Sequence, residues 1–296
     1  MMIRPIAFDF NAQTAVNNSF QVKSSDPFIQ EKALSEFDSF VQVLELNAVD
    51  VTVIQDSHEP PTPDSLFPNN WISFHEKGKI VLYPMYAHNR RLERKPAVLA
   101  SILEKFQINE TIDLTGFEQE EKFLEGTGSM VLDRENKIAY ACISPRTHVE
   151  LLEIFCNQMG YRPIAFSAFD AGNEAIYHTN VMMCVASNFA VVCLEAIKNQ
   201  EANNLLTATL EKSGKKIIPI TIGQMNQFAG NMLQVRSKTG QLFLVMSTRA
   251  FQSLTPQQVS LIQSYCPIIH ASLDTIETNG GGSARCMMAE IFLPVK

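Results

Sequence analysis

Alternating apolar and polar positions divide much of the chain into pairs of short β-rich runs that flank turn residues. A pair of this kind is typical of a β-hairpin. Four pairs follow one another, in residues 71–85, 126–144, 179–197 and 232–247. Their turns lie at Lys-Gly, Arg-Glu-Asn, Ser-Asn and Lys-Thr-Gly. The pattern therefore predicts four hairpins.

Behind each hairpin lies a stretch with apolar residues at three- and four-residue spacing, which is typical of an amphipathic helix. A short apolar strand follows each helix. We expect the helices at 96–106, 148–159, 201–213 and 255–266, and the strands at 110–117, 162–169, 216–222 and 267–273. The N-terminal part has a helix pattern at 27–46 and a strand pattern at 49–56, so it supplies a fifth helix–strand unit.

The residue before each hairpin recurs at a nearly constant interval. Asn70, Glu125, His178 and Asn231 precede the four hairpins, and Cys286 continues the series at steps of 53 or 55 residues. Such regularity predicts a repeat architecture, in which each unit is one supersecondary element. We expect these positions to face a common centre. Asn231 either lines that centre or simply begins a strand.

The last apolar run, residues 286–293, is then expected to pair with residues 4–10 and to close a ring of five units. No low-complexity linker interrupts the sequence, so residues 1–296 are expected to form a single domain. The expected fold class is α/β.

Composition narrows the function classes. Hydrophobic residues make up 46% and charged residues 19% of the chain, and the net charge is −7 without any block of like charges. We therefore expect a soluble protein that binds neither nucleic acid nor a membrane. No apolar run reaches the roughly 20 residues that span a bilayer, and the first residues lack a signal-peptide pattern.

The six cysteines form no C-x-x-C pair and have no metal-ligand spacing with histidine. In a chain of this length they indicate reduced thiols, a cytoplasmic location and no metal site. The sequence leaves open whether the chain forms homo-oligomers.

Cysteine, histidine and glutamate at one centre would combine a nucleophile, a proton-transfer group and an orienting carboxylate. The three are Cys286, His178 and Glu125. We expect His178 as an imidazolium to favour the thiolate and then to protonate a leaving amine. Alone, His178 is typical of a core histidine and Glu125 of a turn carboxylate; the shared spacing favours catalysis.

With these residues in place, the chain resembles the guanidino-group-modifying superfamily. This superfamily, the penteins, includes arginine deiminases, dimethylarginine dimethylaminohydrolases and amidinotransferases. The stretches LEGTGSM, YHTNVMM and GGGSARCM are similar to its segments for the acidic residue, the histidine and the nucleophile. The resemblance implies a five-bladed α/β propeller in which Glu125, His178 and Cys286 are catalytic.

Further residues acquire roles from the same resemblance. ISPRT resembles a segment that binds the substrate α-carboxylate, which assigns that role to Arg146, while NRRLER adds Arg90 or Arg91. The glycine loop that includes Gly281 and Gly282 can pass close to a substrate and offer backbone N–H groups. A tight turn before a last strand is the alternative interpretation of these glycines.

The sequence departs from arginine-using members at the substrate head group. Where those members have two aspartates that bind a guanidinium, this chain has Asn70 and Asn180, and Gly128 replaces a further aspartate. An amide can donate to a carbonyl and accept from an NH₂ group, as a neutral ureido group requires. The pattern resembles the citrulline-utilising hydrolases.

The function predicted from sequence is therefore hydrolysis of citrulline to ornithine, carbon dioxide and ammonia through a covalent cysteine intermediate. The resemblance implies neither a metal nor an organic cofactor. One alternative is an arginine deiminase, dimethylarginine hydrolase or amidinotransferase, which acts on a guanidino group. The other is a non-catalytic ribosome-binding factor that shares the ring fold.

Overall fold

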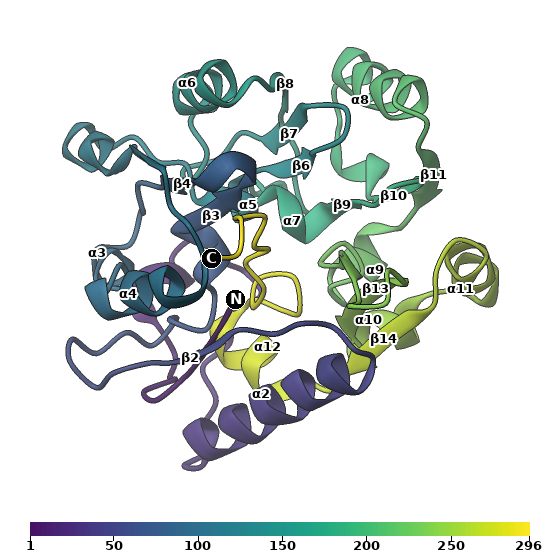
Figure 1. The fold of residues 1–296 in the computed structure, drawn as a ribbon. Helices are drawn as coiled ribbons and strands as arrows, with labels where there is room; N and C mark the ends of the chain where they lie inside the picture. The colour runs from purple at the N-terminus through teal and green to yellow at the C-terminus, as the bar shows by residue number, and fades with distance from the viewer.

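A computed structural model describes all residues 1–296, and its fold is mixed α/β with five small sheets. Figure 1 shows the longer helices around the outside of the molecule and both chain termini in its middle. The four predicted hairpins are present, as are the five predicted helices.

Four sheets share one construction. Two strands form an antiparallel hairpin, and the second of them pairs in parallel with a strand that follows a helix. The strands are β3 (Ile72–His75), β4 (Lys79–Leu82) and β5 (Glu110–Asp113); β6 (Val131–Asp133), β7 (Ile138–Cys142) and β8 (Arg162–Phe166); β9 (Met183–Val185), β10 (Phe189–Val192) and β11 (Lys216–Pro219); and β12 (Leu233–Arg236), β13 (Leu242–Ser247) and β14 (Ile268–Ala271).

The helices that connect the hairpins to their third strands lie on the periphery (Figure 1). They are α4 (Pro96–Lys105), α6 (Val149–Met159), α8 (Gln200–Lys212) and α11 (Pro256–Gln263), with α2 (Ile29–Leu46) in the N-terminal unit. The start of α11 shows how sequence fixes such a helix. Thr255 and Gln258 form a reciprocal capping box, and Pro256 occupies the first turn, where its missing N–H costs nothing.

Shorter helical segments complete the fold. They are α1 (Ala12–Ala15), α3 (His88–Arg91), α5 (Gly126–Ser129), α7 (Thr179–Met182), α9 (Ile222–Met225), α10 (Thr248–Ser253) and α12 (Asp274–Gly280), with 3₁₀ turns at Pro68–Asn70, Glu76–Gly78, Thr115–Glu120 and Leu194–Ala196. None of the helices combines the length and the apolar character needed to cross a membrane.

The fifth sheet differs from the expectation. Its parallel strands are β1 (Met2–Arg4) and β2 (Val53–Gln55), and the C-terminal segment joins it only where Met1 and Ala289 exchange backbone hydrogen bonds of 2.7 and 3.0 Å. The predicted pairing of 286–293 with 4–10 is thus wrong, because the only bridge involves Met1, which lies outside 4–10. Two reasons are local: Pro5 has no N–H to donate, and the three residues from Cys286 to Met288 bond to carbonyls three residues earlier, which makes a turn.

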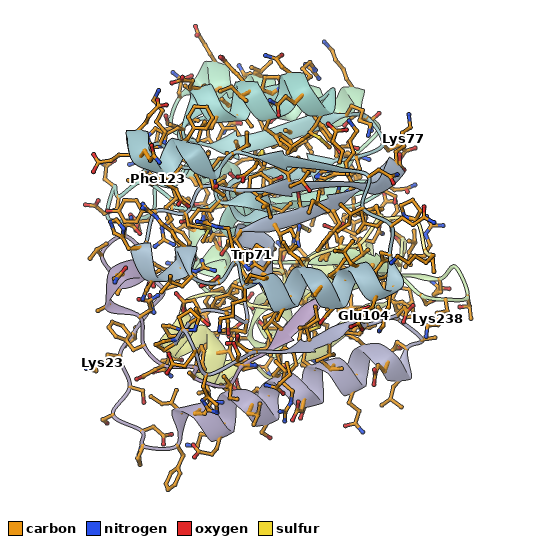
Figure 2. The ribbon with its side chains drawn as sticks, turned by 60° about the vertical axis from the view of Figure 1, so that its left-hand side comes forward. Lys23, Trp71, Lys77, Glu104, Phe123 and Lys238 are labelled. Atoms are coloured by element: carbon orange, nitrogen blue, oxygen red, sulfur yellow. The ribbon has the colours of Figure 1, made fainter.

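The core consists of apolar clusters under the helices. The face of α2 buries Phe37 and Phe40 in the cluster that also contains Cys286 and Met287. Figure 2 shows Trp71 inside the molecule, in agreement with its complete burial. Its labelled charged side chains lie at the periphery: Lys23, Lys77, Glu104 and Lys238.

Short turns deliver the candidate residues to their places. Asn70 ends the 3₁₀ turn before β3, Glu125 precedes α5, and His178 precedes α7. The three turns contact one another, because α5 packs against both the Asn70 turn and α7. The regular spacing in the sequence therefore corresponds to a cluster in space.

Candidate active site

A small, buried pocket collects polar residues that are far apart in the sequence. Its volume is about 20 Å³, which holds about one water molecule. It is lined by Thr14, Asn18, Asp64, Phe67, Asn70, Arg90, Arg146, Tyr177, His178, Gly280, Gly281, Gly282 and Cys286. Of the residues predicted from sequence, Glu125, Asn180 and Arg91 are not part of its lining.

Glu125 lies directly behind His178. Its Oε2 is 2.8 Å from His178 Nε2, its Oε1 accepts the Tyr86 N–H at 2.9 Å, and Arg146 Nη1 is 3.5 Å from Oε2. Burial opposes the charge on Glu125, but the cation on Arg146 and the contact with His178 outweigh it and lower the pKa of Glu125 to about 2. Glu125 is therefore ionised.

His178 has the opposite preference. Burial lowers the pKa of His178 to about 4, although Glu125 pulls it upward. The imidazole is thus neutral at physiological pH, which corrects the expectation of a resting imidazolium. With its proton on Nε2, directed at Glu125, His178 keeps Nδ1 free as a base.

Cys286 is buried, and its sulfur contacts two amides. Asn231 Nδ2 is 3.3 Å and Asn180 Nδ2 is 3.5 Å from Cys286 Sγ. Asn231 therefore contacts the Cys286 sulfur, although it is not part of the pocket lining. Asn180 lines a separate cavity of about 820 Å³, and its Oδ1 is buried without a hydrogen-bond partner.

The glycine loop forms a tight turn after α12 and also lines the pocket. Gly281 ends α12 in the left-handed region at φ +64°, and its N–H is bonded to the Glu277 carbonyl, so this N–H is not free for a substrate. A Cβ on Gly282 would lie 2.8 Å from the Phe67 ring. Close packing therefore requires glycine here. The Gly281 carbonyl accepts the Tyr177 hydroxyl at 2.8 Å.

The two neighbouring arginines have different surroundings. Arg90 is buried and makes two hydrogen bonds to Glu93, at 2.8 and 2.9 Å, while its Nη1 donates to Asn70 Oδ1 at 2.7 Å. Arg91 donates to the Met85 carbonyl at 2.9 Å outside the pocket. Arg90 is thus the pocket residue of the pair, and it holds Asn70.

Arg146 contacts residues 14–18, which we call the N-terminal segment. It donates to the Thr14 carbonyl at 2.7 Å and from Nε to Asn17 Oδ1 at 2.9 Å, and Asn18 Nδ2 donates to the Gly281 carbonyl at 3.3 Å. This segment therefore covers the pocket. In this conformation the pocket has room for about one water molecule and not for an amino acid.

Sequence reasoning missed Asp64. Its Oδ2 accepts from Asn11 Nδ2 at 2.7 Å and from Thr14 Oγ1 at 3.2 Å, whereas its Oδ1 is buried without a hydrogen-bond partner. Burial raises the pKa of Asp64, against the pull of Arg90. A lone aspartate beside prolines is typical of a turn, so the local pattern carried no signal; only its distance to Arg90, 3.8 Å, indicates a site residue.

The amide of Asn70 has a single orientation. Its Oδ1 is held by Arg90, which has only donors, and its Nδ2 is buried without a partner. Gly128 lies next to this amide and leaves no room for a larger residue. A Cβ at position 128 would lie 2.3 Å from Asn70 Nδ2 and 2.8 Å from His178 Nδ1. No group of three His, Cys, Asp or Glu side chains could hold a metal ion.

The fold and the family match place the chain in the pentein superfamily of guanidino-modifying enzymes, whose solved neighbours include C–N hydrolases with a cysteine nucleophile. The family model of eukaryotic N,N dimethylarginine dimethylhydrolase matches residues 4–293, and the chain belongs to that family. Membership of this hydrolase family argues against the ribosome-binding alternative. No curated protein sequence matches the chain.

Solved structures share the fold at low sequence identity. The arginine dihydrolase ArgZ of cyanobacteria has a TM-score of 0.78 at 17% identity over 100% of this chain and 40% of that one. AgrE with ornithine and NAD⁺ has a TM-score of 0.74 at 18% identity over 100% and 39%. A dimethylarginine dimethylaminohydrolase adduct with S-methyl-L-thiocitrulline has a TM-score of 0.65 at 14% identity over 97% and 96%. The chain thus spans about two fifths of ArgZ and AgrE.

Replacing Gly128 with alanine should damage the site without unfolding the protein. The new methyl group displaces the Asn70 amide and the His178 ring, and a misplacement of about 1 Å can cost roughly 100-fold in rate. We expect kcat/KM for the substrate to fall about 100-fold, while the overpacking should lower the free energy of unfolding by only roughly 1–3 kcal/mol. Gly116→Ala is the matched control, since nothing lies within 4 Å of its Cβ. Full activity of Gly128→Ala would show that Asn70 and His178 do not need this space.

Acidification should destabilise the protein partly through His178. An unfolded histidine takes up a proton near pH 6.5, whereas folded His178 stays neutral down to about pH 4. As the pH decreases through this window, the unfolded state binds a proton that the folded state does not, so the free energy of unfolding decreases. Urea unfolding gives the free energy of unfolding at pH 7 and at pH 5. The decrease between the two pH values should be about 2 kcal/mol smaller in His178→Gln than in wild type. The exposed-site control His58→Gln should match wild type. Equal losses in His178→Gln and wild type would mean that His178 is not held neutral.

Proposed function

We propose that this protein hydrolyses the ureido group of citrulline, giving ornithine, carbon dioxide and ammonia. The observation that carries the proposal is the unpartnered Nδ2 of Asn70 in the pocket. A guanidinium presents only N–H donors, which cannot satisfy a donor. A ureido oxygen accepts from it.

Charge supports the same choice. Glu125 is ionised, but both of its oxygens are already hydrogen-bonded, to Tyr86 and His178. The amides of Asn70 and Asn180 carry no charge. A guanidinium at this end of the pocket would lose its water without gaining a free carboxylate, and that is costly for a buried cation. A neutral ureido group avoids this cost.

The amino-acid end of the substrate is assigned to the part of the pocket beneath Thr14. Asp64 and Arg146 both contact Thr14, and Asp64 Oδ1 has no partner. We assign the substrate ammonium to Asp64 Oδ1. The substrate α-carboxylate then binds Arg146 in place of the Thr14 and Asn17 oxygens, as the N-terminal segment that covers the pocket moves aside. Arg90 acts indirectly, by orienting Asn70.

The reaction follows from the protonation states. His178 Nδ1 takes the thiol proton of Cys286, and the thiolate attacks the ureido carbon. Protonated His178, stabilised by Glu125, then gives this proton to the departing ornithine nitrogen as the C–N bond breaks. Water, activated by His178, hydrolyses the S-carbamoyl group to carbamate, which decomposes to carbon dioxide and ammonia.

The wider setting is also proposed. Residues 1–296 act as a single catalytic domain with the five-bladed α/β propeller fold of the superfamily, four blades being the three-stranded sheets and the fifth containing β1 and β2. All six cysteines are unpaired, which suits the cytoplasm.

Arginine is the second candidate substrate. ArgZ, an arginine dihydrolase, has been solved with its substrate and AgrE with L-arginine, and the family match concerns a guanidino substrate. The free oxygen of Asp64 favours this candidate if the guanidinium, rather than the ammonium, lies there. An arginine derivative such as dimethylarginine belongs to the same candidate class.

A substrate panel with one charge-changing variant tests the proposal. Wild type should show a kcat/KM for citrulline at least about 100-fold above that for arginine, measured as ornithine and ammonia release. In Asn70→Asp the donor becomes an anion, so citrulline use should fall about 100-fold and the preference should narrow. Asn204→Asp adds the same charge on the surface and should match wild type.

Two cysteine variants accompany the panel. Cys286→Ala should abolish turnover with an unchanged Tm. Cys193 does not line the pocket, so Cys193→Ala should retain turnover. A wild type that processes arginine faster than citrulline would replace the proposal with its second candidate.

A further inference from the structure

Asn231 makes three contacts that together lead to the nucleophile. It lies just before β12 and is almost completely buried. Its Nδ2 donates to the Asn180 carbonyl at 3.0 Å and contacts Cys286 Sγ at 3.3 Å, and its Oδ1 accepts the Arg285 backbone N–H at 3.0 Å. No part of the mechanism above uses this residue.

We propose that Asn231 is a catalytic residue that stabilises the thiolate of Cys286 by donating a hydrogen bond to its sulfur. A thiolate is only an acceptor, and a hydrogen bond to the charged form of a group favours that form. The donors that contact the sulfur are the amides of Asn231 and Asn180.

The charged groups of the site leave this role to the amides. His178 is neutral at rest, and Arg90 and Arg146 are engaged by Glu93 and the N-terminal segment. Arg285 neighbours Cys286 in the chain, but its guanidinium donates to the Met288 carbonyl at 2.7 Å and to Glu290 at 3.0 Å. No guanidinium therefore donates to the sulfur.

The backbone fixes the direction of the Asn231 amide. The Arg285 N–H can only donate, so it selects Oδ1, and Nδ2 must then face the sulfur and the Asn180 carbonyl. Gly230 permits this approach, because a Cβ there would lie 2.2 Å from the Val181 carbonyl oxygen. An aspartate at 231 would keep the acceptor for Arg285 but would place a negative charge against the sulfur.

The proposal rests on the covalent part of the proposed function and not on the choice of substrate. The test is therefore made without substrate, by alkylating the enzyme with iodoacetamide from pH 5 to pH 10 and locating the adduct on Cys286 by mass spectrometry. The other cysteines lie outside the pocket lining, and burial raises the pKa of Cys142 and Cys184 to about 12, so these thiols should react more slowly. Cys286→Ala gives the background.

The groups facing Cys286 across the pocket stay unchanged in the variants: Asp64, Arg90, Arg146, Tyr177 and His178. In Asn231→Ala the midpoint of the pH–rate curve should move up by about one pH unit, so that alkylation at pH 7 falls about tenfold, the size expected for one hydrogen bond to a charged group. Asn231→Asp should move it further, because the anion opposes the thiolate. Asn203→Ala removes an amide that bonds to the Leu194 and Ile197 carbonyls and to the Thr207 hydroxyl, none of which lines the pocket, and it should match wild type.

The order wild type, then alanine, then aspartate supports the proposal, because a merely structural residue would lower the Tm without shifting the midpoint in this order. An unchanged midpoint in Asn231→Ala overturns it. If Asn231→Asp does not fold, the alanine variant alone decides. A wild-type enzyme that does not turn over citrulline would contradict the proposed function, but the order of the alkylation midpoints would still support the role of Asn231.

Discussion

The proposed substrate preference depends on the buried hydrogen bond from Arg90 to Asn70. An asparagine that faces a pocket can present either its oxygen or its NH₂ group, so its residue type alone does not select a ligand. Arg90 removes this freedom, because a guanidinium has only donors and captures Oδ1. Glu93 holds Arg90 with a two-pronged contact, the strongest and most directional type of ion pair. A fixed donor thus faces the substrate.

The same region shows how buried charge is used. Removing ions from water is expensive, and a pair is tolerated only with good geometry and further hydrogen bonds. Glu125 meets this condition through Tyr86, His178 and Arg146, and Arg90 meets it through Glu93. Burial has the opposite effect on His178, which it holds neutral. The site therefore contains a fixed anion beside a neutral base, an arrangement suited to moving one proton between thiol and leaving amine.

Much of the fold could be predicted because its signals are local. Alternation along each strand and three- to four-residue spacing along each helix are set by neighbours in the chain. The repeat interval predicted that Glu125, His178 and Cys286 face a common centre. The predicted strand pair between the two ends of the chain is absent because it depended on the proline at position 5 and on the turn after Cys286, which apolar patterning does not encode.

The site was predicted less completely, since its missing parts are long-range contacts. The carbonyl of Thr14 lies 132 residues from Arg146 in sequence, and nothing local indicates that this segment covers the pocket. Arg90 and Arg91 are adjacent and chemically identical, so only packing distinguishes them. Asp64 has ordinary sequence surroundings, and its importance appears only in what its buried atoms contact. The repeat interval marked Asn231, but its contact with the Cys286 sulfur could not be predicted from that spacing.

The most direct test of the central claim is a crystal structure of Cys286→Ser with citrulline bound. The ureido oxygen should lie about 2.7–3.2 Å from Asn70 Nδ2, with Arg90 still on Asn70 Oδ1. A complex in which the ureido oxygen points away from Asn70, or in which Asn70 turns its oxygen toward the ligand, would contradict the account.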